Sequence, residues 1–245
     1  AIRRQRQMCI RDRRYRKHKM DTPFKEILSL DLYQLLKPCQ SLFKLSKMKQ
    51  PDLENFVGIH NRKYCDGGQC IRLYKTFMKK KDPEAANIVM GHNEEDLLGL
   101  GTIFSLLAYK KLYDGEYHPK QCVILEQELK IVIELSAAAP VNVSCGNSDF
   151  YLSVNGYEAR MLVHLKEGKL RQYYRNYKDY EFIPGEDTAM PKSITRYMDK
   201  SLKIATTPQT CYTWCNCDED FLNNEKKQMQ YLTHTLPFFL DNLNK

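Results

Sequence analysis

The chain has 245 residues, 42% of them hydrophobic, and a formal net charge of +8. This length is ample to bury a core in one or two domains. No apolar stretch approaches the roughly 20 residues that span a bilayer, and the arginine-rich start lacks the apolar segment of a secretory signal, so composition excludes membrane binding by a spanning helix and favours a cytoplasmic protein. The nine cysteines do not suit a disulfide framework, and we expect reduced thiols.

The positive charge is concentrated at the start of the chain. Residues 1–20 hold nine of the 38 Lys and Arg but only one of the 30 acids, which leaves 29 of each for the remainder. Bulk charge therefore gives no support for phosphate binding by the rest of the chain. The run from Gln7 to Arg13 also resembles translated adapter sequence at the ends of environmental gene assemblies, so residues 1–13 are either an artefact or a disordered basic tail.

The first half of the chain has mostly helical patterns. Residues 14–20 suit the end of a helix, and residues 27–33 read as a short strand before a stop at Pro38. A short helix is predicted from Pro51 to Gly58, and apolar residues recur at helical intervals over 69–81.

The clearest helical pattern starts at His92, with Asn93 as a candidate N-cap. Its predicted face is formed by Leu97, Leu100, Phe104, Leu107 and Lys111, with Ile103 and Ala108 widening it. The glycines at 99 and 101 are expected to allow close packing.

His92 and Asp96 stand four residues apart at the head of this pattern, which places them on one helix face. A base beside a hard-oxygen ligand is what a metal-dependent phosphodiester hydrolase needs. The alternative is an ordinary helix start, whose first turn favours acidic residues.

The second half of the chain changes to a period of two and predicts antiparallel strands. The expected strands are 129–135, 150–154, 159–165 and 170–182, in a meander over about 121–185. Asn155-Gly156 predicts one hairpin turn and Glu167-Gly168 a second. Helices are expected at about 191–200 and 220–243.

Two features of this half admit a functional interpretation. The tyrosines between 173 and 180 alternate with basic residues and could stack nucleic-acid bases, although a half-buried strand explains them too. Cys211, Cys215 and Cys217 suggest zinc, but they lack a paired second knuckle.

A series of motifs occurs in an order seen in one family. They are Asp31-Leu32-Tyr33, Leu53-Glu54 with Gly58-Ile59, Asp66-Gly67-Gly68 before Leu73-Tyr74, and His92 to Leu98. Together they resemble the YprB-like branch of the ribonuclease H-like (DEDD-type) 3′→5′ exonucleases. A second block, from Glu186-Asp187-Thr188-Ala189 to Thr210-Cys211-Tyr212, is similar to the C-terminal region of Firmicute members.

The resemblance implies a fold class and a domain organisation. The fold class is α/β, with the C-terminal part of a ribonuclease H-like fold at residues 14–117. A small antiparallel α+β domain follows at 118–245.

The resemblance also implies a mechanism that uses two Mg²⁺ (or Mn²⁺) ions held by four acids, with single-stranded DNA or RNA as substrate. Asp96 matches the last acid and metal ligand, and His92 matches the base. A histidine at this spacing departs from the family, where tyrosine usually fills the role at four residues.

The first two acidic motifs of the family are absent from this sequence. They would lie upstream of Arg14, and the one D-x-E, at Asp52 to Glu54, matches a non-catalytic helix of the family. Because two-metal hydrolysis needs carboxylates that clamp ions about 3.5 to 4 Å apart, we expect the chain to be an inactive, N-terminally truncated fragment. The alternative is a non-catalytic nucleic-acid-binding or protein-interaction module.

Overall fold

The computed structural model describes residues 15–21, 30–60, 62–64 and 67–243, and the chain forms two structural units, 1–32 and 33–245. In the first unit, residues 15–17 are helical, as expected for the end of a helix, and Lys19 follows with φ +53°. The interpretation of residues 1–13 lies outside the described residues, as does most of the strand expected at 27–33.

The end of that expected strand is helical instead. Leu32 begins helix α2 (Leu32–Leu36), which continues through η1 (Lys37–Cys39) into α3 (Gln40–Phe43). The buried residues Leu36, Cys39 and Phe43 recur here at helical spacing, which is typical of a helix with one face on the core. Pro38 does not end the helical segment. It lies in the first turn of η1, where no helical hydrogen bond is lost.

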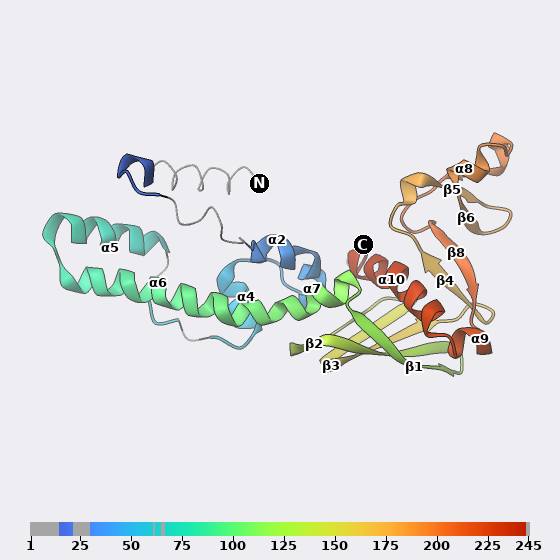
Figure 1. Cartoon of the computed structure of the whole chain (residues 1–245), viewed down its shortest axis with the longest axis horizontal. Helices are drawn as coiled ribbons and strands as arrows, with labels where there is room; N and C mark the ends of the chain where they lie inside the picture. Colours follow the sequence, from blue (N-terminus) through green and yellow to red (C-terminus); the bar gives the residue numbers. More distant parts are fainter. Residues whose placement is uncertain (1–14, 22–29, 61, 65–66, 244–245) are drawn as a thin grey trace. The chain divides into compact units, whose positions relative to one another are not determined.

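The two short helices predicted next are confirmed. Helix α4 (Gln50–Phe56) ends before Gly58, which has φ +90°, and α5 (Gly67–Lys80) covers the segment expected at 69–81 except its last residue, Lys81. Helix α5 lies beside α6 (Pro83–Ile103), and η2 (Phe104–Leu106) and α7 (Leu107–Asp114) follow (Figure 1).

Helix α6 begins much earlier than expected, so the prediction that His92 heads a helix was wrong. Asp82 is its N-cap and accepts a hydrogen bond from Glu84 N at 3.0 Å, and Pro83 occupies the first turn. Asn93 is therefore an interior residue and not a cap.

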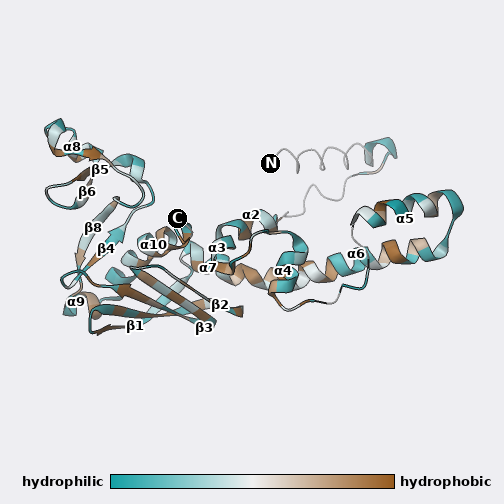
Figure 2. Ribbon diagram, turned by 180° about the vertical axis from the view of Figure 1, so that it is seen from behind, coloured by the Kyte–Doolittle hydropathy of each residue, from teal (hydrophilic) through white to brown (hydrophobic). Residues whose placement is uncertain are grey.

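Only part of the predicted apolar face is buried. Leu97, Leu100 and Phe104 are 71%, 40% and 50% exposed, whereas Ile103 and Ala108, which widen that face, are buried. The helix instead turns its glycine side toward α4, where Gly99 is buried. Brown apolar patches are visible along α5 and α6 in Figure 2.

The second half contains the antiparallel strands that its period of two predicts. Strands β1 (Tyr117–Leu125), β2 (Glu128–Gly146) and β3 (Phe150–His164) form one sheet in the order β1-β2-β3. Alternate residues of β2 and β3 are buried, with Ile131 opposite Met161 and Ile133 opposite Ala159. Helix α7 packs against β2, and α10 contacts β1.

Asn155-Gly156 is not a hairpin turn. It lies inside the continuous strand β3, where Gly156 has φ +54° and pairs with Ala139 at an irregularity in the register. The chain reverses earlier, at 147–149, because Asn147 Oδ1 accepts hydrogen bonds from the backbone nitrogens of Asp149 and Phe150. The turn predicted at Glu167-Gly168 is confirmed, with both residues at positive φ.

The strand expected at 170–182 is divided into two. Strand β4 (Lys169–Tyr173) pairs with β8 (Tyr212–Asn216), and β5 (Tyr180–Ile183) pairs with β6 (Thr188–Pro191) and β7 (Ile204–Ala205). The helical turn η3 (Tyr177–Asp179) separates β4 from β5. A hydrogen bond from Asn176 Nδ2 to Asp179 Oδ2 at 3.1 Å stabilises that turn locally.

Both C-terminal helices are interrupted. The first is reduced to α8 (Lys192–Thr195), and η4 (Lys200–Leu202) follows because Asp199 caps it through Ser201 N. The second consists of α9 (Glu219–Leu222) and α10 (Glu225–Asp241), since Asn224 caps α10 through Lys227 N. The ring of Phe238 on α10 stacks on Tyr173 at 3.9 Å between centroids.

The described residues thus form a mixed structure of helices and small antiparallel sheets, and no strand precedes Tyr117 among them. The ribonuclease H-like arrangement and the expected domain boundaries stay predictions. Within the same residues, no helix is both long enough and apolar enough to cross a bilayer.

Candidate active site around His92 and Asp96

His92 and Asp96 lie on one face of α6, as their spacing requires. His92 Nε2 is 3.6 Å from Asp96 Oδ2, which is an ion-pair distance but too long for a good hydrogen bond. The imidazole is mostly buried, with its side chain 14% exposed, while the Asp96 side chain is 39% exposed. The geometry therefore brings a base and a carboxylate together, and their chemical roles stay predictions.

The carboxylate of Asp96 already has a cationic partner. Arg62 donates from Nη1 to Asp96 Oδ1 at 2.7 Å. The same guanidinium donates from Nε and Nη2 to the two oxygens of Glu54, each at 2.7 Å. Such a two-pronged contact is the strongest geometry for an arginine and a carboxylate.

Glu54 is the most buried member of this group, with a side chain only 3% exposed. The hydrogen bond from Arg62 is the main cause that lowers its pKa, and a further hydrogen bond from Gln50 acts in the same direction against the effect of burial. The contact with Glu54 in turn raises the pKa of Arg62. The pair is therefore fully charged at neutral pH.

Gln50 joins α4 to α6. Its Nε2 donates to Glu54 Oε1 and to the backbone oxygen of Asp96, both at 2.8 Å. The close approach depends on Gly99, because a Cβ there would lie 1.9 Å from Glu54 Oε1. The expectation of close packing is confirmed for Gly99 and wrong for Gly101, which has no neighbour within 4 Å of such an atom.

A second carboxylate of α6 holds the segment that bears Arg62. Glu95 accepts hydrogen bonds from the backbone nitrogens of Lys63 and Tyr64, at 2.7 and 3.3 Å. The ring of Tyr64 lies over Gly91, where a Cβ would approach it to 2.2 Å. Glu95 thereby positions Arg62 opposite α6 without contacting its guanidinium.

A hollow of about 420 Å³ opens at this group, and His92 and Asp96 face it together with Arg62. Its other lining residues are Gln50, Pro51, Tyr64 and Gly67. His92 Nδ1 is buried and has no hydrogen-bond partner within the described ranges. The hollow therefore presents one imidazole, one carboxylate and one guanidinium to a ligand.

The described residues do not make a metal centre by themselves. Both oxygens of Glu54 and one oxygen of Asp96 are bound to Arg62, which leaves Asp96 Oδ2 as the one acidic oxygen beside His92 that the guanidinium does not contact. In the described part of the chain no three His, Cys, Asp or Glu side chains are placed to share an ion. A hard divalent cation requires more oxygen ligands than this.

Sequence reasoning missed Arg62 and its contact with Glu54. Arg62 is 8 residues from Glu54 and 34 from Asp96, so no local pattern connects the three. For the helix boundary a signal was present, since Asp82-Pro83-Glu84 is a typical helix start.

Most of the tyrosines between 173 and 180 and of the cysteines of the possible zinc site pack against other residues of the chain. Tyr173 is buried against Phe238, and Tyr174 stacks on Tyr180 with centroids 5.2 Å apart. Cys211 and Cys217 are buried, and burial raises the pKa of each thiol to about 11. These features favour core packing for Tyr173 and for both thiols.

The comparisons with known proteins bear on the first half of the chain. Residues 9–108 match the family model described as the RNase H superfamily, which is less than half of the chain. No curated protein and no solved structure gives a significant match. The matched range contains both His92 and Asp96, and it supports an RNase H-like domain and, with it, hydrolysis of nucleic acid as the general activity.

Proposed function

We propose that this chain is part of a metal-dependent 3′→5′ exonuclease that hydrolyses single-stranded DNA or RNA in the cytoplasm, and that by itself it is inactive. The match of residues 9–108 to the RNase H superfamily supports nucleic acid as the substrate class. The placement of His92 and Asp96 on one face of α6, where both line a hollow, supports their assignment as base and metal ligand.

The observation that carries the second part of the proposal is the pairing of Arg62. A divalent ion of this superfamily would supply an activated water and neutralise charge on the phosphate. Asp96 offers it one oxygen, no three His, Cys, Asp or Glu side chains of the described residues are placed to share an ion, and the first two acidic motifs of the resembled family are missing from the sequence. We therefore expect no hydrolysis until those ligands are supplied.

The test compares this chain with a form extended by the coding sequence that precedes it. Each is given single-stranded DNA and RNA labelled at the 5′ or the 3′ end, with Mg²⁺ or Mn²⁺. We expect metal-dependent loss of 3′-terminal nucleotides from the extended form, and none from the chain alone. Trimming by the chain alone would show that the proposed inactivity is wrong.

The variant Asp96→Asn examines the assigned ligand. It keeps the size of the side chain and removes the charge, and we expect trimming by the extended form to fall at least about a hundredfold, since metal clamping contributes several kcal/mol. Asp114→Asn is the matched control, because Asp114 also pairs with a cation, Lys110, four residues away on a helix. Equal activity in the two variants would exclude the role of Asp96.

A second candidate function is favoured by the same arginine. The guanidinium of Arg62 binds two carboxylates and so takes the place of a metal ion, which suits a non-catalytic nucleic-acid-binding module. Titration of Mn²⁺ into the extended form, followed by the electron paramagnetic resonance signal of the free ion, separates the two functions. Binding that Asp96→Asn weakens supports the exonuclease, and absence of binding supports the module.

A further inference from the structure

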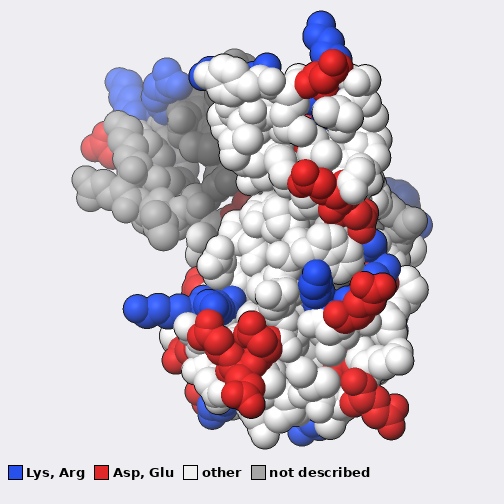
Figure 3. Space-filling model, turned by 90° about the vertical axis from the view of Figure 1, so that its right-hand side faces the viewer, with Lys and Arg blue, Asp and Glu red and all other residues white. Residues whose placement is uncertain are grey.

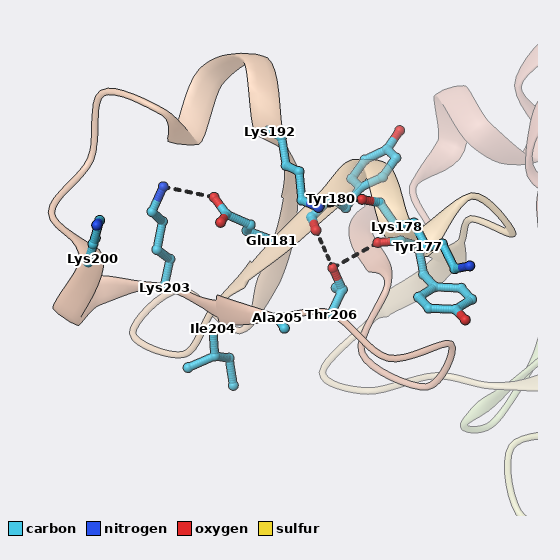
Figure 4. Close-up of a pocket in the computed structure, with 10 residues that line it drawn as sticks. All are labelled: Tyr177, Lys178, Tyr180, Glu181, Lys192, Lys200, Lys203, Ile204, Ala205 and Thr206. Atoms are coloured by element: carbon cyan, nitrogen blue, oxygen red, sulfur yellow. Dashed lines mark hydrogen bonds and ion pairs between the residues drawn. The ribbon is translucent and has the colours of Figure 1, made fainter.

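The second half of the chain contains a hollow of about 570 Å³ that is remote in sequence from His92. It lies among η3, β5, α8, η4 and β7, and Figure 4 shows its lining side chains. Four of them are lysines, at positions 178, 192, 200 and 203, and one is acidic, Glu181. The charged groups around the hollow therefore leave an excess of three positive charges.

The one acid that lines the hollow, Glu181, already has a cationic partner. Glu181 Oε2 lies 2.9 Å from Lys203 Nζ and also accepts a hydrogen bond from the Thr195 hydroxyl. These two contacts lower the pKa of Glu181, first through Thr195 and then through Lys203. Glu181 is consequently charged at neutral pH and is committed to its own partners.

Of the four lysines, Lys178 and Lys200 are free to contact a ligand, and the other two are bound within the protein. Lys192 donates to the backbone oxygen of Lys178 at 2.5 Å, and Lys203 donates to that of Thr195 at 2.6 Å, so both are held in place. The ammonium groups of Lys178 and Lys200 make no hydrogen bond or ion pair with any described residue, and both side chains are exposed.

The acids next to these lysines in the sequence are bound to neighbouring residues outside the hollow. Asp179 accepts a hydrogen bond from Asn176 Nδ2 at 3.1 Å, and Asp199 accepts two from Ser201, at 2.8 and 2.9 Å. Neither carboxylate lines the hollow.

Hydrogen bonds join the elements that line the hollow, and part of its surface is apolar. The buried Thr206 hydroxyl bonds to the backbone oxygens of Tyr177 and Tyr180, which ties β7 to η3 and β5 (Figure 4). Ile204 is 54% exposed at the same surface, and the ring of Tyr177 is half-buried. An aromatic ring and an aliphatic side chain beside ammonium groups suit a base or sugar attached to a phosphate.

We propose that this lysine hollow binds the phosphodiester backbone of single-stranded nucleic acid, with Lys178 and Lys200 on the phosphates and Tyr177 and Ile204 against a base or sugar. The choice of nucleic acid among polyanions rests on the proposed function. A concave site suits a flexible strand better than a flat bilayer. On the face drawn in Figure 3, basic and acidic side chains are interspersed, so local arrangement and not bulk charge provides the site.

The test maps lysine acylation in the whole chain with and without an oligothymidylate of about 20 nucleotides, a length that spans one such site. Mass spectrometry then gives the acylation rate of each lysine. Lys79 and Lys226, which are exposed and far from the hollow in sequence, serve as internal controls. Because each lysine is read separately, binding by the basic residues 1–20 does not obscure the result.

We expect the oligonucleotide to slow acylation of Lys178 and Lys200 at least about fivefold at low salt, with little change at Lys79 and Lys226. Equal protection of all four lysines, or of none, would overturn the proposal. Protection by inorganic phosphate or polyglutamate as strong as by the oligonucleotide would also overturn it. Protection by phosphatidylglycerol vesicles alone would assign the hollow to a membrane surface instead.

The double variant Lys178→Ala/Lys200→Ala gives a second readout. In fluorescence anisotropy with the same oligonucleotide, the slope of log K against log salt should fall by about 1.4, the value for two phosphate contacts on a single strand. Lys79→Ala/Lys226→Ala removes the same charge and should leave the affinity unchanged. This binding is measured without metal, so it can succeed where trimming fails and fail where trimming succeeds.

Discussion

Arg62 Nη1 donates to Asp96 Oδ1 across 2.7 Å, and it thereby binds the carboxylate that α6 places beside His92. The same guanidinium holds both oxygens of Glu54. One arginine therefore links the segment after α4 to the middle of α6 and determines how much negative charge the hollow presents.

Removal of this arginine should destabilise the protein. We expect Arg62→Met to lower the free energy of unfolding by about 3 kcal/mol, because it leaves the buried Glu54 carboxylate without its partner. Urea denaturation followed by circular dichroism measures the change. Arg160→Met is the control, since Arg160 and Glu158 are 59% and 47% exposed and their pair should be worth less than about 1 kcal/mol. Equal losses would show that Arg62 is merely a surface residue.

The same contact predicts a pH dependence. Arg62 holds the pKa of Glu54 below its ordinary value of 4.5, so the stabilisation is complete above that pH and is lost as the pH falls through the lower folded-state value. In urea titrations from pH 7 to acid pH, Glu54→Gln should be less stable at neutral pH and lose less stability below about pH 4.5. Glu158→Gln should keep the slope of the unmodified protein. A parallel slope for Glu54→Gln would contradict the prediction.

The two glycines of α6 should respond in opposite directions to alanine. In Gly99→Ala the new Cβ meets Glu54 Oε1 at 1.9 Å and has to displace a carboxylate that Arg62 holds, so we expect a loss of about 1–3 kcal/mol. Gly101→Ala meets nothing within 4 Å and should stabilise the helix by about 0.5–1 kcal/mol. Thermal unfolding of both variants gives the sign. A gain in Gly99→Ala would mean that α4 and α6 are not in contact there.

The exposed face of α6 also makes a prediction about stability. Leu97 is 71% exposed, so Leu97→Gln should change the free energy of unfolding by less than about 0.5 kcal/mol. Ile103 is 1% exposed, and Ile103→Ala should cost about 2–5 kcal/mol through the cavity that it leaves. Chemical denaturation of the two variants measures both changes in the free energy of unfolding. A large loss in Leu97→Gln would show that this face is packed in solution.

The buried thiols should react slowly. Burial raises the pKa of Cys39 and of Cys145 to about 12, so at pH 8 only about one part in 10⁴ is the nucleophilic thiolate. Iodoacetamide labelling followed by mass spectrometry should modify the partly exposed Cys215 before either of them. In urea the three should label at similar rates. Fast native labelling of Cys39 would mean that its surroundings open readily.

The sequence alone predicted much of the local structure. Helix start and stop signals located α4. Periodicity located α5 and the strands of the second half, because apolar side chains must alternate along a strand and recur every three or four residues on a helix. It also placed His92 and Asp96 on one face, since a spacing of four is fixed by helix geometry. The order of motifs led to the superfamily that the match of residues 9–108 supports.

Other features were decided by tertiary contacts. Asn155-Gly156 has the composition of a hairpin turn, yet pairing of β3 along the length of β2 keeps it within a strand. Arg62 meets Glu54 and Asp96 from far along the chain, and only the packing of α4 against α6 brings the three charges together. Local patterns reveal which residues share a face, because the backbone geometry is regular. Which faces meet, and which charges are neutralised there, depends on contacts between segments that no local spacing records.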